Sequence, residues 1–249
     1  MSIRQSEWVL RGVRWGSMAL AFIAFTFLLY AFIELLRFAN ILPRPVVCVG
    51  TSWECGMTQQ TMEALPGHGK FINTVTYRKD PPANLAGYTS ARGDMWISAK
   101  LEDVQKRTLL IHEYGHVVDF FHFTGKPRGV TSPFTVRYLP VFQGDPSLDF
   151  YTISWVNTGT RKPGSASEDF VTEYARETAV EDFAESYAYY VVAKKSFEQR
   201  AAANTVLRAK FDYVKSLFPV EFTAVDVHAW NGSVPLSTRD LSYQWNPET

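Results

Sequence analysis

The chain has 249 residues, 46% of them hydrophobic and 20% charged, and this length and composition allow one well-packed core. Lysine and arginine together number 25, as do aspartate and glutamate, so the formal net charge is +0. Nucleic-acid-binding proteins carry a marked excess of basic residues, and this neutral balance excludes nucleic acid as an expected partner.

An apolar run near the N-terminus extends from Trp15 to Ile33 without a charged residue. These 19 residues suffice for a helix that crosses a bilayer, so we predict a transmembrane signal anchor over residues 15–36. A cleaved signal peptide is the alternative, but the run exceeds a typical signal-peptide core and no small-residue cleavage site follows it. Three arginines precede the run and two follow it, which favours a cytoplasmic N-terminus.

The only two cysteines of the chain, Cys48 and Cys55, follow this run closely. A pair so close in sequence suits a local disulfide in an oxidising compartment. Two free thiols on a cytoplasmic domain are the alternative. Together with the anchor, the cysteines predict a single-pass membrane protein whose domain is extracytoplasmic, in the periplasm or outside the cell.

Strands are predicted between residues 69 and 98, where apolar and polar side chains alternate. A hairpin is expected around residues 91–94, and the strand Met95–Ser98 follows it. A helix over residues 101–123 comes next, and apolar residues all around its surface indicate that it is buried.

This helix contains the motif HExxH, formed by His112, Glu113 and His116. Histidines four residues apart share one helix face, so both imidazoles can bind one zinc ion, and Glu113 can take a proton from the attacking water. The alternative is a chance arrangement, but unpartnered polar groups on a buried helix are unfavourable. Asp119 either orients the His116 ring or is a solvated acid.

Residues 125–164 are rich in proline and glycine, which excludes long regular elements. A helix is predicted to start at Ser165 or Ser167, and a last helix covers residues 196–218. Between them lies a further helix with three carboxylates in one row, at Glu177, Glu181 and Glu185. Such a row is commonly a solvated face, but here it continues into apolar residues, and a buried carboxylate needs a cation or strong donors.

HEYGHVVD, followed by a tyrosine and the acids of EDFAE, resembles the lethal-factor-like zinc metallopeptidases, the family of the anthrax lethal factor and a branch of the zincins. The resemblance covers about residues 88 to 195. It implies that Glu181 is the third zinc ligand, that Glu185 accepts a bond from a ligand histidine, and that Tyr174 faces the substrate carbonyl. It also implies that Met95–Ser98 is a sheet edge that binds the substrate backbone; a strand inside the sheet is the alternative.

The sequence thus predicts an α+β fold, with a zincin-like metallopeptidase domain preceded by a single transmembrane helix. We expect a cytoplasmic segment over residues 1–14, the anchor over residues 15–36, a linker with the cysteine pair over residues 37–65, and a catalytic domain over residues 66–249.

The predicted function is that of a membrane-anchored zinc metallopeptidase acting on protein or peptide substrates. His112, His116 and Glu181 are the predicted zinc ligands, and Glu113 and Tyr174 the predicted catalytic residues. One alternative is a catalytically silent interaction module that keeps zinc for folding. Another is a binding or structural protein without a metal.

Overall fold

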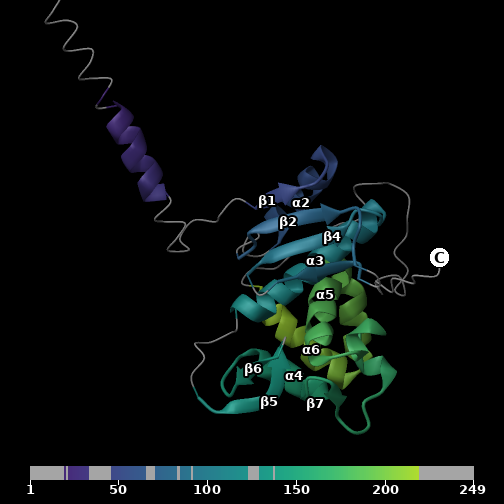
Figure 1. The fold of residues 1–249 in the computed structure, drawn as a ribbon. Coiled ribbons are helices and arrows are strands. Elements are labelled where there is room, and N and C mark those ends of the chain that lie inside the picture. Colours follow the sequence, from purple (N-terminus) through teal and green to yellow (C-terminus); the bar gives the residue numbers. More distant parts are fainter. Residues whose placement is uncertain are drawn as a thin grey trace, which may run out of the picture. The chain divides into compact units, whose positions relative to one another are not determined.

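The computed structural model describes residues 20, 22–33, 46–65, 71–82, 85–90, 92–122, 129–136 and 138–218, without the side chains of residues 121–122. The chain divides into two compact units, Met1–Arg44 and Pro45–Thr249. The second unit holds every strand that the structure describes (Figure 1).

The predicted membrane-spanning helix over residues 15–36 is wrong. Within the described part of that range, residue 20 and residues 22–33 are helical. Among all described residues, no helix is long and apolar enough to cross a membrane. The predicted single-pass membrane location depended on this span and is wrong with it. Residues 1–14 lie outside the described residues.

A four-stranded sheet forms one layer of the second unit (Figure 1). Its strands follow the order β1-β2-β4-β3, with bounds Val47–Val49, Thr74–Arg78, Asp94–Ser98 and Gly87–Thr89 respectively. β1, β2 and β4 are parallel, whereas β3 is antiparallel to β4. The described residues therefore form a mixed α/β domain, which corrects the predicted class of an α+β domain preceded by a transmembrane helix.

The hairpin predicted around residues 91–94 is confirmed, because β3 and β4 pair in antiparallel register on either side of it. β4 is not an edge strand, since it pairs with β2 on one side and with β3 on the other. The prediction that residues 95–98 form a substrate-binding edge is therefore wrong. The hairpin places β3 outside β4, and β3 is the edge of the described sheet on this side.

Helix α2, Ser52–Ala64, follows β1 and lies in the second compact unit, within the residues predicted to be a linker. Thr51 caps the helix, and Glu54 accepts a bond from the Thr51 backbone, which completes a capping box. The predicted disulfide between Cys48 and Cys55 is present. It ties α2 to strand β1.

Helix α3, Asp103–His122, agrees with the helix predicted over residues 101–123. Residues 106–120 are buried without exception. Figure 1 shows α3 between the sheet and helix α5, Ala179–Ala203, and α3 contacts β3, β4 and α5. The motif helix is thus the central layer of the domain, enclosed on both sides.

The segment predicted to hold no long regular element forms short ones, as expected from its prolines and glycines. They are the hairpin of β5 (Thr131–Val136) and β6 (Leu139–Phe142), helix α4 (Ser147–Ser154), and the hairpin of β7 (Trp155–Asn157) and β8 (Thr160–Arg161). α4 packs on α5, with the Phe150 and Phe183 rings 5.2 Å apart between centroids.

The helix predicted to start at Ser165 or Ser167 is absent. Two short 3₁₀ turns replace it, η1 at Ser167–Asp169 and η2 at Tyr174–Arg176. The carbonyls of the two residues after η1 accept hydrogen bonds from the guanidinium of Arg200 on α5. Because these two carbonyls bind the distant Arg200, the segment packs against α5 in an irregular conformation and does not form a helix.

The last helix, predicted over residues 196–218, is divided between the end of α5 and helix α6, Thr205–Ser216. Asn204 separates them with an extended backbone, and its side chain accepts a bond from the backbone N–H of Leu207 to cap α6. The same side chain donates to Asp169 in η1. A polar residue with partners on both sides thus ends one helix and begins the next.

Candidate metal centre

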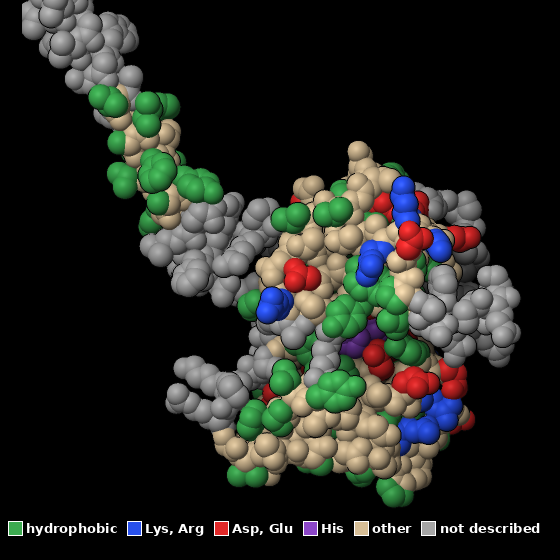
Figure 2. All heavy atoms as spheres, viewed as in Figure 1, with side chains coloured by type: hydrophobic (Ala, Val, Ile, Leu, Met, Phe, Trp, Pro, Cys, Tyr) green, Lys and Arg blue, Asp and Glu red, His purple; other side chains and the backbone are tan. Residues whose placement is uncertain are grey.

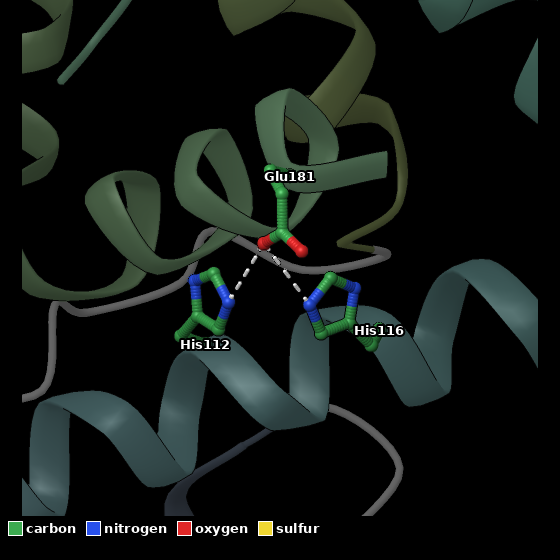
Figure 3. A group of neighbouring side chains, drawn as sticks. All are labelled: His112, His116 and Glu181. Atoms are coloured by element: carbon green, nitrogen blue, oxygen red, sulfur yellow. Dashed lines mark ion pairs between the residues drawn. The ribbon is translucent and has the colours of Figure 1, made fainter. Parts of the chain in front are cut away.

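Two histidines on α3 point to the same side of the helix, as their spacing predicts. His112 and His116 are both buried, and their ring centroids lie 4.8 Å apart. Figure 3 shows both rings turned from α3 toward the carboxylate of Glu181 on the facing helix, α5. The structure therefore brings together the three residues that the sequence analysis predicts as ligands.

Glu181 reaches the histidines because of two local features. Thr178 caps α5 by accepting a bond from the backbone N–H of Glu181 at 3.2 Å, which fixes this residue in the first helical turn. Gly115, inside the HExxH motif, lets the two helices approach closely. A Cβ atom at Gly115 would lie 3.0 Å from the Cα atom of Ala184 on α5. A larger residue there would push Glu181 away from the histidines.

The three side chains converge on one point. Oε2 of Glu181 lies 3.2 Å from Nε2 of His112 and 3.3 Å from Nε2 of His116. Neither contact has hydrogen-bond geometry, and this buried oxygen has no hydrogen-bond partner among the described residues. Buried polar atoms are rarely left unpaired, and a cation between the three would satisfy all of them. Their ligand atoms lie within 4.8 Å of one another, so the group can hold a metal ion.

Electrostatics in the centre favour a cation. Burial alone lowers the pKa of His112, but the neighbouring carboxylates of Glu181 and Glu185 outweigh it and raise that pKa to about 10. Burial raises the pKa of Glu181, but the two neighbouring histidines outweigh it and lower that pKa, so the carboxylate is ionised. A metal ion that binds here replaces a proton.

Glu185 binds the ring nitrogen of His112 that faces away from the centre. Its Oε1 lies 2.7 Å from Nδ1 of His112, so this ring nitrogen faces the carboxylate and Nε2 faces the centre. Thr172 donates to the other oxygen of Glu185 at 2.5 Å and accepts from the backbone N–H of Ala175 in η2. Carboxylates in this position fix a ligand histidine in one orientation. Thr172 is a member of the site that the sequence analysis does not identify.

Glu113 is buried beside the group without belonging to it. Its carboxylate lies against strand β3, where Thr89 donates to Oε2 at 2.5 Å. Figure 2 shows histidine and acidic side chains at the floor of a hollow, with hydrophobic side chains around it. A molecule from solution can therefore approach the centre from this face.

Tyr174 lies in η2, at the edge of the same centre. Its ring centroid is 5.9 Å from that of His112. Burial raises the pKa of Tyr174, and the negative charges of Glu181 and Glu113 raise it further. Its hydroxyl therefore stays protonated and can act as a hydrogen-bond donor in the site.

Asp119 neither orients the His116 ring by a hydrogen bond nor lies in solvent. It is buried and accepts bonds from the Ser147 hydroxyl at 2.6 Å and from the Tyr151 hydroxyl. Burial raises the pKa of Asp119 to about 6. Nδ1 of His116 has no hydrogen-bond partner among the described residues. Asp119 instead fastens α3 to α4.

The fold and the site together define a mixed α/β protein in which two facing helices present a His–His–Glu group that can hold a metal ion. No family model matches the chain, and neither the curated proteins nor the solved structures contain a match. What the group does is therefore inferred from its own chemistry.

The two glutamates are expected to respond differently to substitution. Glu181→Gln removes the charged oxygen between the imidazoles, whereas Glu185→Gln changes only the group behind His112. We expect Glu185→Gln to weaken metal binding about 10- to 100-fold and Glu181→Gln to weaken it more. Titration of the metal-free variants with Zn²⁺ measures both, with Glu198→Gln on the exposed surface of α5 as control. A stronger effect at Glu185 would reverse the two assignments.

Proposed function

We propose that this chain is a zinc-dependent metallopeptidase that hydrolyses peptide bonds in protein or peptide substrates. The proposal rests on one observation, namely that a His–His–Glu group lies beside a second buried carboxylate, Glu113, that is not part of it. Two imidazoles and one carboxylate are a ligand set of catalytic zinc, which keeps a further position open. A carboxylate held next to such a position is placed for proton transfer.

Each residue of the centre has one role in this proposal. A bound zinc ion supplies Lewis acidity, which lowers the pKa of water and polarises a carbonyl group. Glu113 takes a proton from the attacking water and returns it to the departing amine. Tyr174 donates a hydrogen bond to the carbonyl oxygen as it becomes negative. Glu185 keeps His112 in the tautomer and orientation that direct Nε2 to the centre.

The resemblance to the lethal-factor-like zinc metallopeptidases supports these roles. In that family a tyrosine precedes the ligand glutamate by seven residues and a second acid follows it by four, as Tyr174, Glu181 and Glu185 do. A catalytically silent, zinc-stabilised interaction module is the competing function. A purely structural zinc site has four protein ligands, whereas the group in the described residues has three, and it needs no general base.

Peptide cleavage by the full-length chain tests the proposal. The zinc-loaded protein is incubated with a peptide library, and the products are identified by mass spectrometry. Cleavage is expected, together with its loss after chelation and its recovery when zinc is returned, because metal removal takes away the Lewis acid. Tight zinc binding that stabilises the fold without cleaving any peptide would support the silent module instead.

Tyr174→Phe is expected to lower kcat about 10²- to 10³-fold with little change in KM, because the hydroxyl acts mainly in the transition state. The ring is retained, so zinc content and thermal stability should hardly change. Steady-state kinetics, with zinc analysis and a melting curve on the same preparation, measure all three. Loss of stability with unchanged turnover would show that the hydroxyl serves only the fold.

A further inference from the structure

Strand β3 presents alternate residues to the motif helix. Thr89 is fully buried and Gly87 is half-buried, whereas Tyr88 between them is exposed. Side chains of a strand alternate between its two faces, so positions 87 and 89 lie on the side of α3, which β3 contacts. The short edge strand thus meets α3 through two small residues.

Thr89 binds the Glu113 carboxylate directly. Its Oγ1 lies 2.5 Å from Oε2 of Glu113 and 3.2 Å from the main-chain oxygen of the same residue. A threonine hydroxyl has one proton, and the shorter contact indicates that it is donated to the carboxylate. One carboxylate oxygen of Glu113 is therefore bound to β3 by the Thr89 hydroxyl.

Gly87 leaves room for the other oxygen. A Cβ atom at this position would lie 2.9 Å from Oε1 of Glu113 and 3.0 Å from Cδ2 of Leu109. The carboxylate therefore lies close against bare backbone at one end and against the Thr89 hydroxyl at the other. The strand restricts the carboxylate to one orientation, in which Oε2 is bonded to Thr89 and Oε1 lies against the backbone of Gly87.

We propose that Thr89 is the positioning residue for Glu113, with Gly87 providing the space in which the second carboxylate oxygen lies. This inference rests on the proposed peptidase function, because it assigns to Glu113 the role of proton acceptor. Side chains that take part in proton transfer must be held in the productive geometry, and a displacement of about 1 Å can lower the rate about 10²-fold. Thr89 acts through Glu113 and needs no contact with the substrate.

Two comparisons at position 89 test the hydroxyl group alone: wild type with Thr89→Val, and Thr89→Ser with Thr89→Ala. Threonine and Thr89→Val have nearly the same shape, as do Thr89→Ser and Thr89→Ala, and each pair differs by one hydroxyl group. We expect Thr89→Val to lower kcat about 10- to 100-fold at unchanged KM and zinc content, and Thr89→Ser to retain most of the wild-type kcat. Should Thr89→Val fold poorly in melting curves, the serine and alanine variants give the same comparison.

Binding of acetohydroxamate to the zinc-loaded protein gives a readout that needs no turnover. Its acidic proton can be accepted by a correctly placed Glu113, so its affinity should fall at least about threefold in the variants that lack the hydroxyl and remain in Thr89→Ser. Equal kcat and equal acetohydroxamate affinity within each pair would overturn the role of Thr89. The wild type could cleave no peptide and yet bind acetohydroxamate more tightly than the variants that lack the hydroxyl. The peptidase proposal would then fail, whereas the positioning of Glu113 by Thr89 would stand.

Discussion

Glu113→Gln is expected to remove most peptide hydrolysis while zinc stays bound. Glutamine has almost the shape of glutamate and can accept the Thr89 hydrogen bond, but it cannot take a proton from water. General-base catalysis contributes about 10²- to 10⁴-fold, so kcat should fall by this factor. Because Glu113 lies outside the His–His–Glu group, zinc content and the unfolding midpoint should stay close to those of the wild type.

The experiment compares initial rates of the zinc-loaded variant and the wild type on a peptide that the wild type cleaves. Glu198→Gln, on the exposed face of α5, removes the same charge away from the centre and serves as the control. Full activity in zinc-loaded Glu113→Gln would exclude this residue as the base. Loss of zinc in the variant would mean that Glu113 supports metal binding rather than proton transfer.

The part of the candidate metal centre that depends on helix spacing alone could be predicted from the sequence. His112 and His116 share one face of a helix wherever that helix lies, because the spacing alone sets their direction. Glu181 is different, since nothing in the sequence around it separates it from Glu177 or Glu185 as the expected ligand. The resemblance selected Glu181, and the Thr178 cap and the close contact at Gly115 explain why it is the one that reaches the histidines.

Residues that act on the centre from another element have no local signal. Thr89 and Thr172 lie in short segments of ordinary composition, and their roles depend on which carboxylate each one meets in the folded chain. A hairpin before the motif helix could be predicted, but not that its first strand would form the sheet edge beside Glu113. The sequence pattern therefore identifies the candidate ligands more readily than the residues that orient them.

Two errors in the fold likewise come from contacts between distant parts of the chain, and the third, the membrane span, has a different cause. The helix expected after Ser165 is replaced by two turns, because Arg200 binds the carbonyls between them across a long sequence separation. The helix break at Asn204 depends on its bond to Asp169. The predicted membrane span rests on hydropathy alone, which counts apolar residues and does not establish that they form one long helix.

A buried ion pair holds the first turn of α5, next to Glu181 of the candidate metal centre. Nζ of Lys210 on α6 lies 2.7 Å from Oδ2 of Asp182, and both side chains are 0% exposed. Nζ also donates to the main-chain oxygen of Asp169, and the Trp155 indole donates to Asp182. Burial raises the pKa of Asp182 and lowers that of Lys210, so it disfavours both charged forms. Each group therefore depends on the opposite charge of its partner to stay ionised.

Lys210→Met is therefore expected to destabilise the protein by about 3 to 5 kcal/mol, because it leaves the Asp182 carboxylate buried without its cation. Urea unfolding monitored by tryptophan fluorescence measures the change, and Lys215→Met, on the exposed side of the same helix, should stay within about 0.5 kcal/mol of the wild type.

Adding Asp182→Asn to Lys210→Met should recover part of the loss, since the amide removes the buried charge and can still accept the Trp155 hydrogen bond. The double variant should also bind zinc more tightly than Lys210→Met alone, because the first turn of α5 carries both Asp182 and Glu181. If Lys210→Met unfolds at the same urea concentration as Lys215→Met, the ion pair does not hold this turn, and the position of Glu181 depends on the Thr178 cap and the Gly115 contact alone.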